Sequence, residues 1–478
     1  MEFMQAGKFK DNAREAMADR NLQSALAQLK GGFIPRRQEA ADRLPEFDAL
    51  RDRARELKDH VLANLDFYLE TFEENCRTAG GSVHWCATAE DARAAILGIC
   101  REAGARTVTK GKSMVAEEIH LNGFLERHGI TPVETDLGEY IIQLADEPPS
   151  HIIGPAVHKT KDQVSDLFLE HHRQYGKTVR QTEPAAIINE AREVLRQKYF
   201  DADVGITGAN FLIAETGSTL IVTNEGNGDL TQTLPKTHIV VTSIEKVVPT
   251  LEDVSTILRV LARSATGQDF SAYTTLSTGG RREGDLDGPE NFHVILLDNG
   301  RSAMLGTEFQ DMLRCIRCGA CMNHCPVYHS VGGHTYGAVY VGPMGAVLTP
   351  SLEGIDDARH LPGASTFCGR CESVCPMKIP LPKMMRHWRE RAYDSGASPP
   401  LERWGLNVWA WTARQPWLYG AGARLAVRLL KRLGRGNGRL RRLPLAGGWT
   451  KGRDFPAPEG RTFQEQWRAR QRAERVAP

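Results

Sequence analysis

Two short runs of the chain concentrate residues that can bind metal. The first is Cys315-Ile-Arg-Cys318-Gly-Ala-Cys321-Met-Asn-His-Cys325-Pro326, and the second is Cys368-Gly-Arg-Cys371-Glu-Ser-Val-Cys375-Pro376. The first run has the C-x2-C-x2-C-x3-C-P spacing of a bacterial-type iron–sulfur site. The second has the same pattern without its leading cysteine. Because this spacing lets several thiolates converge on one cubane, the sequence predicts an iron–sulfur protein that carries electrons.

The spacing also assigns ligands to two clusters. In proteins with paired runs, the fourth cysteine of each run ligates the cluster of the other run. This rule gives the first cluster a full set of four thiolates, from Cys315, Cys318, Cys321 and Cys375. It gives the second cluster three thiolates, from Cys325, Cys368 and Cys371. The expected cofactors are therefore two [4Fe–4S] clusters, the second with only three cysteine ligands.

The second cluster lacks one thiolate, because Ser365 stands in register with the missing cysteine. A serine alkoxide is one candidate for the fourth ligand, and a nearby histidine (His324, His329 or His334) is another. A three-cysteine cluster with an open or exchangeable iron is favoured, because serine is a poor ligand for a site that prefers soft thiolates. Zinc also binds C-x2-C pairs, but the two Cys-Pro endings favour iron–sulfur chemistry.

Other residues near the cysteines have two interpretations. Arg317 and Arg370 lie between ligand cysteines, where a cation would favour the reduced, more negative cluster, or they belong to a solvated face. The remaining cysteines, Cys76, Cys86 and Cys100, are widely spaced and are expected to be structural residues of the core.

Strands and helices alternate between residues 81 and 300. Strands are expected at residues 82–86, 106–109, 131–135, 238–242 and 292–297, with two or three more within 204–224. Helices are expected at 113–128 and 251–263, and Thr88 with Asp91 indicates a partial capping box at another helix start. This alternation predicts a largely parallel sheet covered on both faces.

Four regions are expected along the chain. Residues 1–60 form an N-terminal helical segment, with a break between two helices at Pro35. Residues 61–300 form the α/β domain, and residues 301–398 an α-helical ferredoxin-type domain with an inserted Gly/Pro-rich loop. Residues 399–478 form a basic, Trp-rich C-terminal region.

Two stretches of the α/β domain resemble ligand sites only weakly. Lys110-Gly-Lys-Ser113 looks like the end of a phosphate-binding loop, but Arg106 stands where the first glycine belongs, so a helix start capped by Ser113 is favoured. Glu215 and Glu225 lie beside glycine turns after strands, where α/β folds place ligands. Roles in stabilising those turns are at least as well supported as binding or catalysis.

The C-terminal region differs from the rest in charge. Residues 401–478 hold 17 Lys/Arg and 5 Asp/Glu, so the net charge of +1 for the whole chain leaves −11 for residues 1–400. Six tryptophans lie here: Trp404, Trp409, Trp411, Trp417, Trp449 and Trp467. Residues 420–435 are expected to form a short basic amphipathic helix. Docking of a partner protein is the first expectation, and peripheral contact with an anionic membrane the second; no nucleic-acid motif is present.

Composition and targeting signals predict a cytoplasmic protein, and a peripheral location at the inner face of the membrane is the second expectation. The N-terminus has no apolar segment typical of a secretory signal, and no apolar run is long enough to span a bilayer. Clustered thiols stay available as metal ligands only in a reducing compartment.

Over nearly its whole length the sequence resembles the lactate utilization protein B family. The resemblance rests on the block from Thr207 to Gly217, the cysteine run from Cys315 to Tyr328, the loop from Gly332 to Pro350, and the run from Cys368 to Pro380. It implies a LUD domain similar in fold to sugar-phosphate isomerases and coenzyme A transferases. It also implies two [4Fe–4S] clusters, a missing eighth cysteine that is usual in the family, and other subunits of a lactate oxidation system as partners.

Three hypotheses follow for the function. The first is an electron-transfer subunit acting while L-lactate is oxidised to pyruvate elsewhere in a complex, with no catalytic residue assigned to this chain. The second is a catalytic LUD domain of acyl or phosphosugar type that uses Glu215 or Glu225, with regulatory clusters. The third is an iron–sulfur scaffold protein assembled through its C-terminal region.

Overall fold

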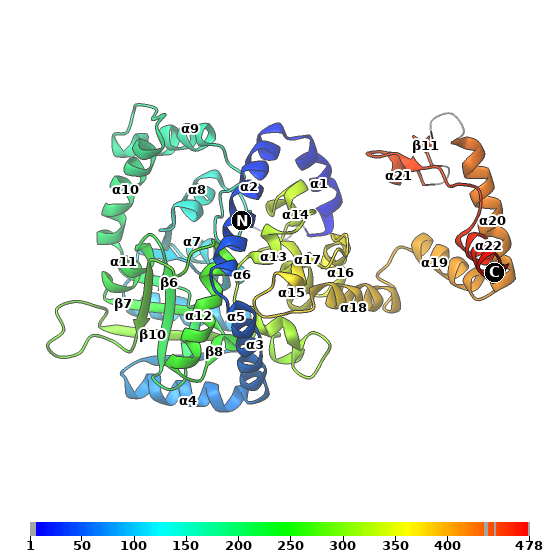
Figure 1. Cartoon of the computed structure of the whole chain (residues 1–478). Helices are drawn as coiled ribbons and strands as arrows, with labels where there is room; N and C mark the ends of the chain where they lie inside the picture. The colour runs from blue at the N-terminus through cyan, green and yellow to red at the C-terminus, as the bar shows by residue number, and fades with distance from the viewer. Residues whose placement is uncertain (1–5, 435–437, 444–445, 477–478) are drawn as a thin grey trace. The chain divides into compact units, whose positions relative to one another are not determined.

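The computed structural model describes residues 6–434, 438–443 and 446–476 (Figure 1). The chain folds into two compact units, residues 1–397 and residues 398–478. The first unit contains the helical N-terminus, an α/β region and the two cysteine runs.

A sheet of six parallel strands forms the centre of the first unit. Its order is β1 (Ser82–Cys86), β10 (Asn291–Leu297), β7 (Thr237–Ser243), β4 (Val204–Thr207), β2 (Thr107–Gly111) and β3 (Thr131–Glu134). The expected parallel sheet is confirmed. The central strand β7 is buried at every residue, as is usual within parallel sheets, which explains its Val- and Ile-rich sequence.

Helices cover both faces of this sheet. Alternate residues of a strand point to opposite faces, and the strands use this alternation. Ile239 belongs to the apolar core that includes Ile96 of α5 (Ala89–Glu102), while its neighbour Val240 belongs to the core that includes Phe72 of α4 (Leu65–Thr78). The capping box of α5 is confirmed, since Thr88 Oγ1 accepts from Asp91 N and the Asp91 carboxylate accepts from Thr88 N.

Further helices complete the α/β region. They are α8 (Leu137–Ala145), α9 (Lys161–His171), α10 (Pro184–Asp201), α11 (Asn227–Thr233) and α12 (Leu251–Ala265). The single helix expected at residues 113–128 is wrong. His120 takes a left-handed conformation with φ of 50°, which separates α6 (Met114–Glu118) from α7 (Leu121–Arg127) and lets both short helices bury side chains in one core.

A second, smaller sheet packs beside the first. Its strands, in order, are β8 (Val247–Val248), β5 (Phe211–Ile213), β6 (Ser218–Thr223) and β9 (Tyr273–Ser277). The strands β5 and β6 come from the glycine-rich block at 204–224. Phe211 and Leu220 face a core shared with α12 and with the cysteine-bearing region.

The N-terminal helices are α1 (Phe9–Ala18), α2 (Arg20–Asp42) and α3 (Phe47–Ala63). The expected break at Pro35 is wrong, because α2 runs through it. Proline removes one helical hydrogen bond, but buried residues on both sides, Leu29 and Ala40 among them, hold the helix in place. Figure 1 shows α1 and α2 beside the helices of the cysteine region, and α2 packs against α13 and α14.

The cysteine region is helical, as expected. Its α-helices are α13 (Ala320–Asn323), α14 (Tyr328–Val331), α15 (Gly342–Glu353), α16 (Ile355–Ala358), α17 (Arg370–Ser373) and α18 (Leu381–Asp394). The 3-10 helix η5 (Gln310–Arg314) leads into the first cysteine run. The inserted loop is ordered and buried around Tyr336, up to the start of α15 at Gly342.

The second unit is mainly helical. It contains α19 (Pro400–Ala413), α20 (Pro416–Leu433), α21 (Gly447–Thr450) and α22 (Phe463–Val476), with a two-stranded ribbon of β11 (Arg439–Leu440) and β12 (Phe455–Pro456). No residue of α19 or α20 is buried. Within the described ranges, no helix has the length and apolar character needed to cross a bilayer.

Candidate functional site

The two cysteine runs share one local backbone fold. In each, a residue in left-handed conformation (Arg317 or Phe367) precedes a Cys-Gly pair whose glycine is also left-handed, with φ of 73° at Gly319 and 78° at Gly369. A short helix, α13 or α17, starts at the next residue. The two residues with positive φ bend the chain tightly. The bend brings cysteines that are close in sequence onto one side of the backbone.

This correspondence continues along both runs. Cys318, Cys321 and Cys325 match Cys368, Cys371 and Cys375 in position. Cys315 then corresponds to Ser365, since each lies two residues before the first left-handed residue of its run. The structural register therefore places the serine where the first run has its leading cysteine.

The thiols interact electrostatically in two groups. The members of the first thiol group are Cys315, Cys318, Cys321 and Cys375. The members of the second thiol group are Cys325, Cys368 and Cys371. Each group combines cysteines from both runs. Cys321 also interacts with Cys371, so the two groups adjoin.

The thiols differ in their exposure. Cys318, Cys321, Cys325, Cys371 and Cys375 are buried, Cys315 is partly buried, and Cys368 is exposed. Burial raises the pKa of Cys371 to about 12 and that of Cys375 to about 11. Thiols in such surroundings stay protonated unless a metal binds them, because metal binding displaces the proton.

The donor set fits an iron–sulfur cluster. A small cavity is lined by all four thiols of the first group together with apolar side chains such as Met344, Ile379 and Leu381. In the described part of the chain, no three His, Cys, Asp or Glu side chains meet closely enough for a single metal ion. A cubane presents its irons at separate corners, so its thiolates stand farther apart than the ligands of one ion.

Cations from the N-terminal helices surround the first thiol group. Arg37 of α2 donates to Val374 O at 2.9 Å and interacts electrostatically with Cys318 and Cys375. Arg51 of α3 donates to Cys375 O at 2.8 Å. Neither arginine belongs to a sequence motif. Their positions beside the thiols result from the packing of α2 and α3 against the second cysteine run.

The arginines within the runs have different surroundings. The side chain of Arg317 is 9% exposed and lies over the ring of Tyr340, 4.6 Å from its centroid. Arg370 is exposed. Arg317 also forms a 3.2 Å ion pair with Glu245, and Glu245 lies 3.0 Å from Arg301. These cations hold the pKa of Glu245 at about 2 despite its burial.

The residues predicted as candidates for a fourth ligand of a second cluster all make other hydrogen bonds. Ser365 Oγ accepts from Phe367 N at 3.0 Å. His324 Nδ1 bonds Ala320 O at 2.9 Å, and His329 Nε2 bonds Asn323 O at 2.7 Å. His334 bonds Ser150 Oγ at 3.2 Å and stacks on His158.

The two candidate glutamates of the α/β region lie in different places. Glu225 lines a cleft at the edge of the six-stranded sheet and forms a 3.0 Å ion pair with Lys112. Glu215 accepts a hydrogen bond from Leu251 N, at the start of α12. Only Glu225 is placed at a ligand-sized opening, while Glu215 stabilises a helix start.

Lys110 and Ser113, the two ends of the stretch that resembles a phosphate-binding loop, have structural roles, and the predicted helix cap at Ser113 is confirmed. Ser113 Oγ accepts from Ala116 N and caps α6. Lys110 is fully buried in β2 and pairs with Glu117 and, at 2.7 Å, with Glu134.

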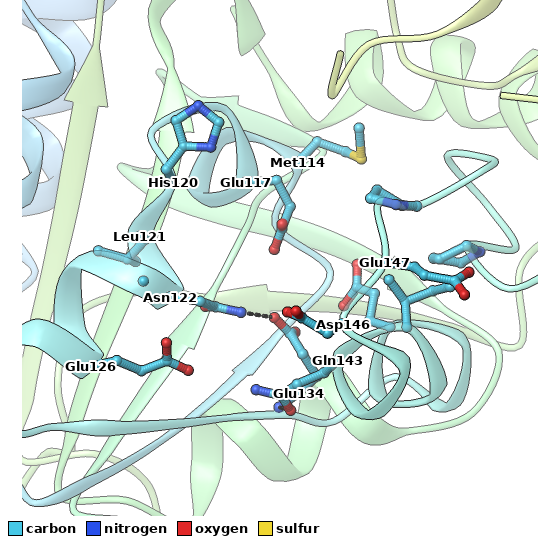
Figure 2. Close-up of a pocket in the computed structure, with 15 residues that line it drawn as sticks. Met114, Glu117, His120, Leu121, Asn122, Glu126, Glu134, Gln143, Asp146 and Glu147 are labelled. Atoms are coloured by element: carbon cyan, nitrogen blue, oxygen red, sulfur yellow. Dashed lines mark hydrogen bonds between the residues drawn. The ribbon is translucent and has the colours of Figure 1, made fainter. Parts of the chain in front are cut away.

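A neighbouring cavity is rich in carboxylates (Figure 2). Glu117, Glu126, Glu134, Asp146 and Glu147 line it, and Asn122 Nδ2 donates to Glu134 Oε1 at 2.6 Å. Burial raises the pKa of Glu134 and, more strongly, that of Glu139. Sequence patterns did not point to this cavity, because its carboxylates come from separate strands and helices.

The three remaining cysteines are structural, as predicted. Cys76, Cys86 and Cys100 are buried within the apolar cores on the two faces of the large sheet. Burial raises the pKa of Cys76 and Cys86 to about 11.

Comparison with known families matches three consecutive parts of the chain. The LUD domain matches residues 69–297, the 4Fe-4S dicluster domain residues 311–379, and the family described as "Lactate utilisation protein B, C-terminal" residues 379–472. A DUF162 family protein from Deinococcus radiodurans is structurally similar over 49% of this chain and 98% of its own. Its TM-score of 0.26 and 19% identity are too low to support an argument about the fold.

Full-length relatives give the same family. Lactate utilization protein B from Geobacillus kaustophilus (strain HTA426) is 44% identical, covering 98% of both chains. The protein of the same name from Bacillus subtilis (strain 168) is 42% identical, covering 98% of this chain and 97% of its own. With this identity over nearly its full length, the chain belongs to the lactate utilization protein B family.

Proposed function

We propose that this protein is an iron–sulfur electron-transfer subunit that acts in the oxidation of L-lactate to pyruvate. The names of its relatives supply the link to lactate. The observation that carries the proposal is that the two thiol groups adjoin, since Cys371 of the second group acts electrostatically on Cys321 of the first. Two adjoining redox centres in one chain suit a carrier better than a single-step enzyme.

The proposed ligands follow the two thiol groups. The first cluster takes Cys315, Cys318, Cys321 and Cys375, and the second takes Cys325, Cys368 and Cys371. Two [4Fe–4S] clusters bound in this way supply one-electron carriers over a wide range of reduction potentials. Arg37 and Arg51 place positive charge beside the first group, which favours its more reduced state.

The second cluster has three thiolates and an open or exchangeable iron in this proposal. Ser365 is in register with Cys315, but serine is a weak ligand for a thiolate-preferring site. The exposure of Cys368 supports a second centre near the surface, where an electron leaves for another protein. The first group, in contrast, is more fully buried.

The second unit is the proposed docking element for other proteins of lactate utilisation. Its helix α20 exposes Leu425, Leu429 and Leu433 on one stripe, at 61%, 48% and 62%. Arg and Lys residues between these leucines flank the apolar stripe with positive charge. Peripheral contact with an anionic membrane is the second role proposed for this unit.

Growth on lactate tests the function. In a strain that lacks its own copy of this protein, the parent chain and the Cys100→Ser variant should restore growth on L-lactate. The Cys321→Ser variant should not, because it removes a proposed ligand where the two thiol groups adjoin. Normal growth with Cys321→Ser, at matched protein levels, would reject the electron-transfer role.

A catalytic LUD domain is the second candidate, and one observation favours it. Glu225 and Lys112 form an ion pair at the mouth of a cleft beyond the carboxyl ends of parallel strands, where α/β enzymes bind their substrates. Under this candidate, Glu225→Gln abolishes growth on lactate while Cys321→Ser only reduces it. The electron carrier predicts the reverse order.

A further inference from the structure

The large sheet ends in a cleft at its carboxyl edge. Lys112, Asp136, Asn210 and Lys246 line it, and they follow β2, β3, β4 and β7, four neighbouring strands of the sheet. In open α/β sheets, ligands bind beyond the carboxyl ends of the strands. The cleft has a volume of about 170 Å³, so it would take only a small organic molecule.

The opposite wall of this cleft is the first cysteine run. Four consecutive residues, Cys315 to Cys318, line it. The thiols of Cys315 and Cys318 belong to the first thiol group. A molecule bound at the sheet edge would therefore lie against the proposed ligand loop of the first cluster.

Two cations in the cleft have unused hydrogen-bonding capacity. Lys246 donates to Ala209 O at 2.6 Å and forms no ion pair within the described residues. Arg317 pairs with Glu245, but its Nη1 is buried with no hydrogen-bond partner in the described part of the chain. A buried donor without a partner is costly, and an anion in the cleft would satisfy it.

The fixed charges at the floor of the cleft are unbalanced. Glu245 is shared by Arg301 and Arg317, and Arg301 also pairs with Glu118. Among the described residues, Lys58 donates to two backbone carbonyls, Glu245 O and Val247 O. Burial lowers the pKa of Lys246 to about 8 although Glu245 opposes this change. Three carboxylates, Asp136, Glu139 and Glu225, line another part of the cleft, and Lys112 pairs with two of them. The attraction for a negatively charged ligand is therefore confined to the part of the cleft around Lys246 and Arg317.

Part of the lining is apolar. It includes Met114, Ile152, Phe211, Val222, Leu261 and Ile316. Inorganic phosphate would leave these side chains without a contact. An organic acid would cover them with its body while its carboxylate reaches the cations.

We propose that this cleft binds a small organic carboxylate, held by Lys246 and the free Nη1 of Arg317, with its apolar body against the Cys315–Cys318 loop. The proposal concerns binding by the α/β domain, and it stands whether or not the protein carries electrons from lactate. Bound negative charge next to Cys315 would also make ligand occupancy detectable at the first cluster.

Calorimetry on the full-length, cluster-loaded protein under anaerobic conditions tests this site. The probes are hexanoate, pyruvate and inorganic phosphate, with neutral hexanamide as the match for hexanoate. At least one carboxylate should bind, while hexanamide should not. Lys246→Met should weaken that binding by roughly tenfold to a hundredfold, as expected for the loss of one charge-assisted hydrogen bond. Lys246→Arg should retain most of it.

Matched variants separate the site from unspecific effects. Lys236→Met removes an exposed lysine elsewhere and should leave the affinity unchanged. Ser271→Trp adds bulk to the lining without changing any charge, and it should block binding. This variant still tests the site if Lys246→Met lowers the cluster content. The proposal is overturned if neither carboxylate binds, if Lys246→Met and Ser271→Trp bind like the parent, or if phosphate and the carboxylates bind equally well.

Discussion

Arg317, which lies between two cysteines of the first run, forms a 3.2 Å ion pair with Glu245, which follows strand β7. The two side chains are 9% and 3% exposed. This pair joins the cysteine region directly to the large sheet. Arg301, at 3.0 Å from the same carboxylate, extends it into a buried network.

Replacing Glu245 should strongly destabilise the protein. The Glu245→Gln variant leaves Arg301 and Arg317 buried without their shared carboxylate, and breaking such a pair costs about 3–5 kcal/mol. Chemical denaturation of the cluster-loaded protein measures this cost. Glu193→Gln, whose carboxylate pairs with Lys177 and is 63% exposed, should change stability by less than about 1 kcal/mol. Equal effects of the two variants would contradict the network.

Iron and labile-sulfide analysis should distinguish the proposed ligands from the structural cysteines. The parent should hold about eight irons, the content of two [4Fe–4S] clusters. Cys318→Ser should lose about half of this iron, because it removes one of the four thiolates of the first cluster. Cys100→Ser, which changes a core cysteine behind the sheet, should keep the parent's content. A parent that contains zinc without sulfide would reject the clusters altogether.

The first cluster should become harder to reduce when Arg37 is neutralised. Arg37→Gln removes a positive charge that interacts with Cys318 and Cys375, and a less positive environment disfavours the more negative reduced cluster. A redox titration followed by electron paramagnetic resonance should show a more negative potential. Arg43→Gln, at the exposed end of α2, is the matched control. An unchanged potential in Arg37→Gln would show that the guanidinium serves only to bind Val374.

Stability should depend on pH through Glu353. Burial raises the pKa of this carboxyl from 4.5 to about 7, and Glu118 and Asp357 add to the effect. Between these values the folded chain keeps a proton that the unfolded chain has lost, so this group lowers stability as the pH rises from about 5 to 7. Glu353→Gln stays neutral and should be more stable than the parent by about 1–2 kcal/mol at pH 8 after solvent screening, and by little at pH 5. A difference that is the same at both pH values would contradict this account.

Changes in the exposed stripe of α20 should weaken the binding of partner proteins and leave the iron–sulfur content unchanged. Leu425→Gln combined with Leu429→Gln should weaken the association with the other lactate utilisation proteins, measured by affinity capture of the purified components. The iron content should equal that of the parent. Lys451→Gln, an exposed change in the same unit, serves as control. Undiminished capture by the double variant would place the docking surface elsewhere.

The sequence contained enough information to predict the cysteine runs, the parallel sheet and the helical nature of the C-terminal region. These depend on local spacing and on periodicity, which a single chain displays directly. The helix break predicted at Pro35 and the single helix predicted across His120 are both wrong, because tertiary packing overrides local preference at these two residues. The ion pair of Arg317 with Glu245 and the contacts of Arg37 could not be predicted, since they join residues that are 72 and 337 positions apart in the chain.

Anaerobic visible spectroscopy of the cluster-loaded protein tests the central claim most directly. The protein is mixed with the other purified lactate utilisation proteins, and L-lactate is then added. Electron transfer predicts bleaching of the cluster absorption with L-lactate, and no bleaching when Cys321→Ser replaces the parent chain. If the parent contains its full iron and sulfide and its spectrum stays oxidised with lactate and partners present, the chain does not carry electrons from lactate.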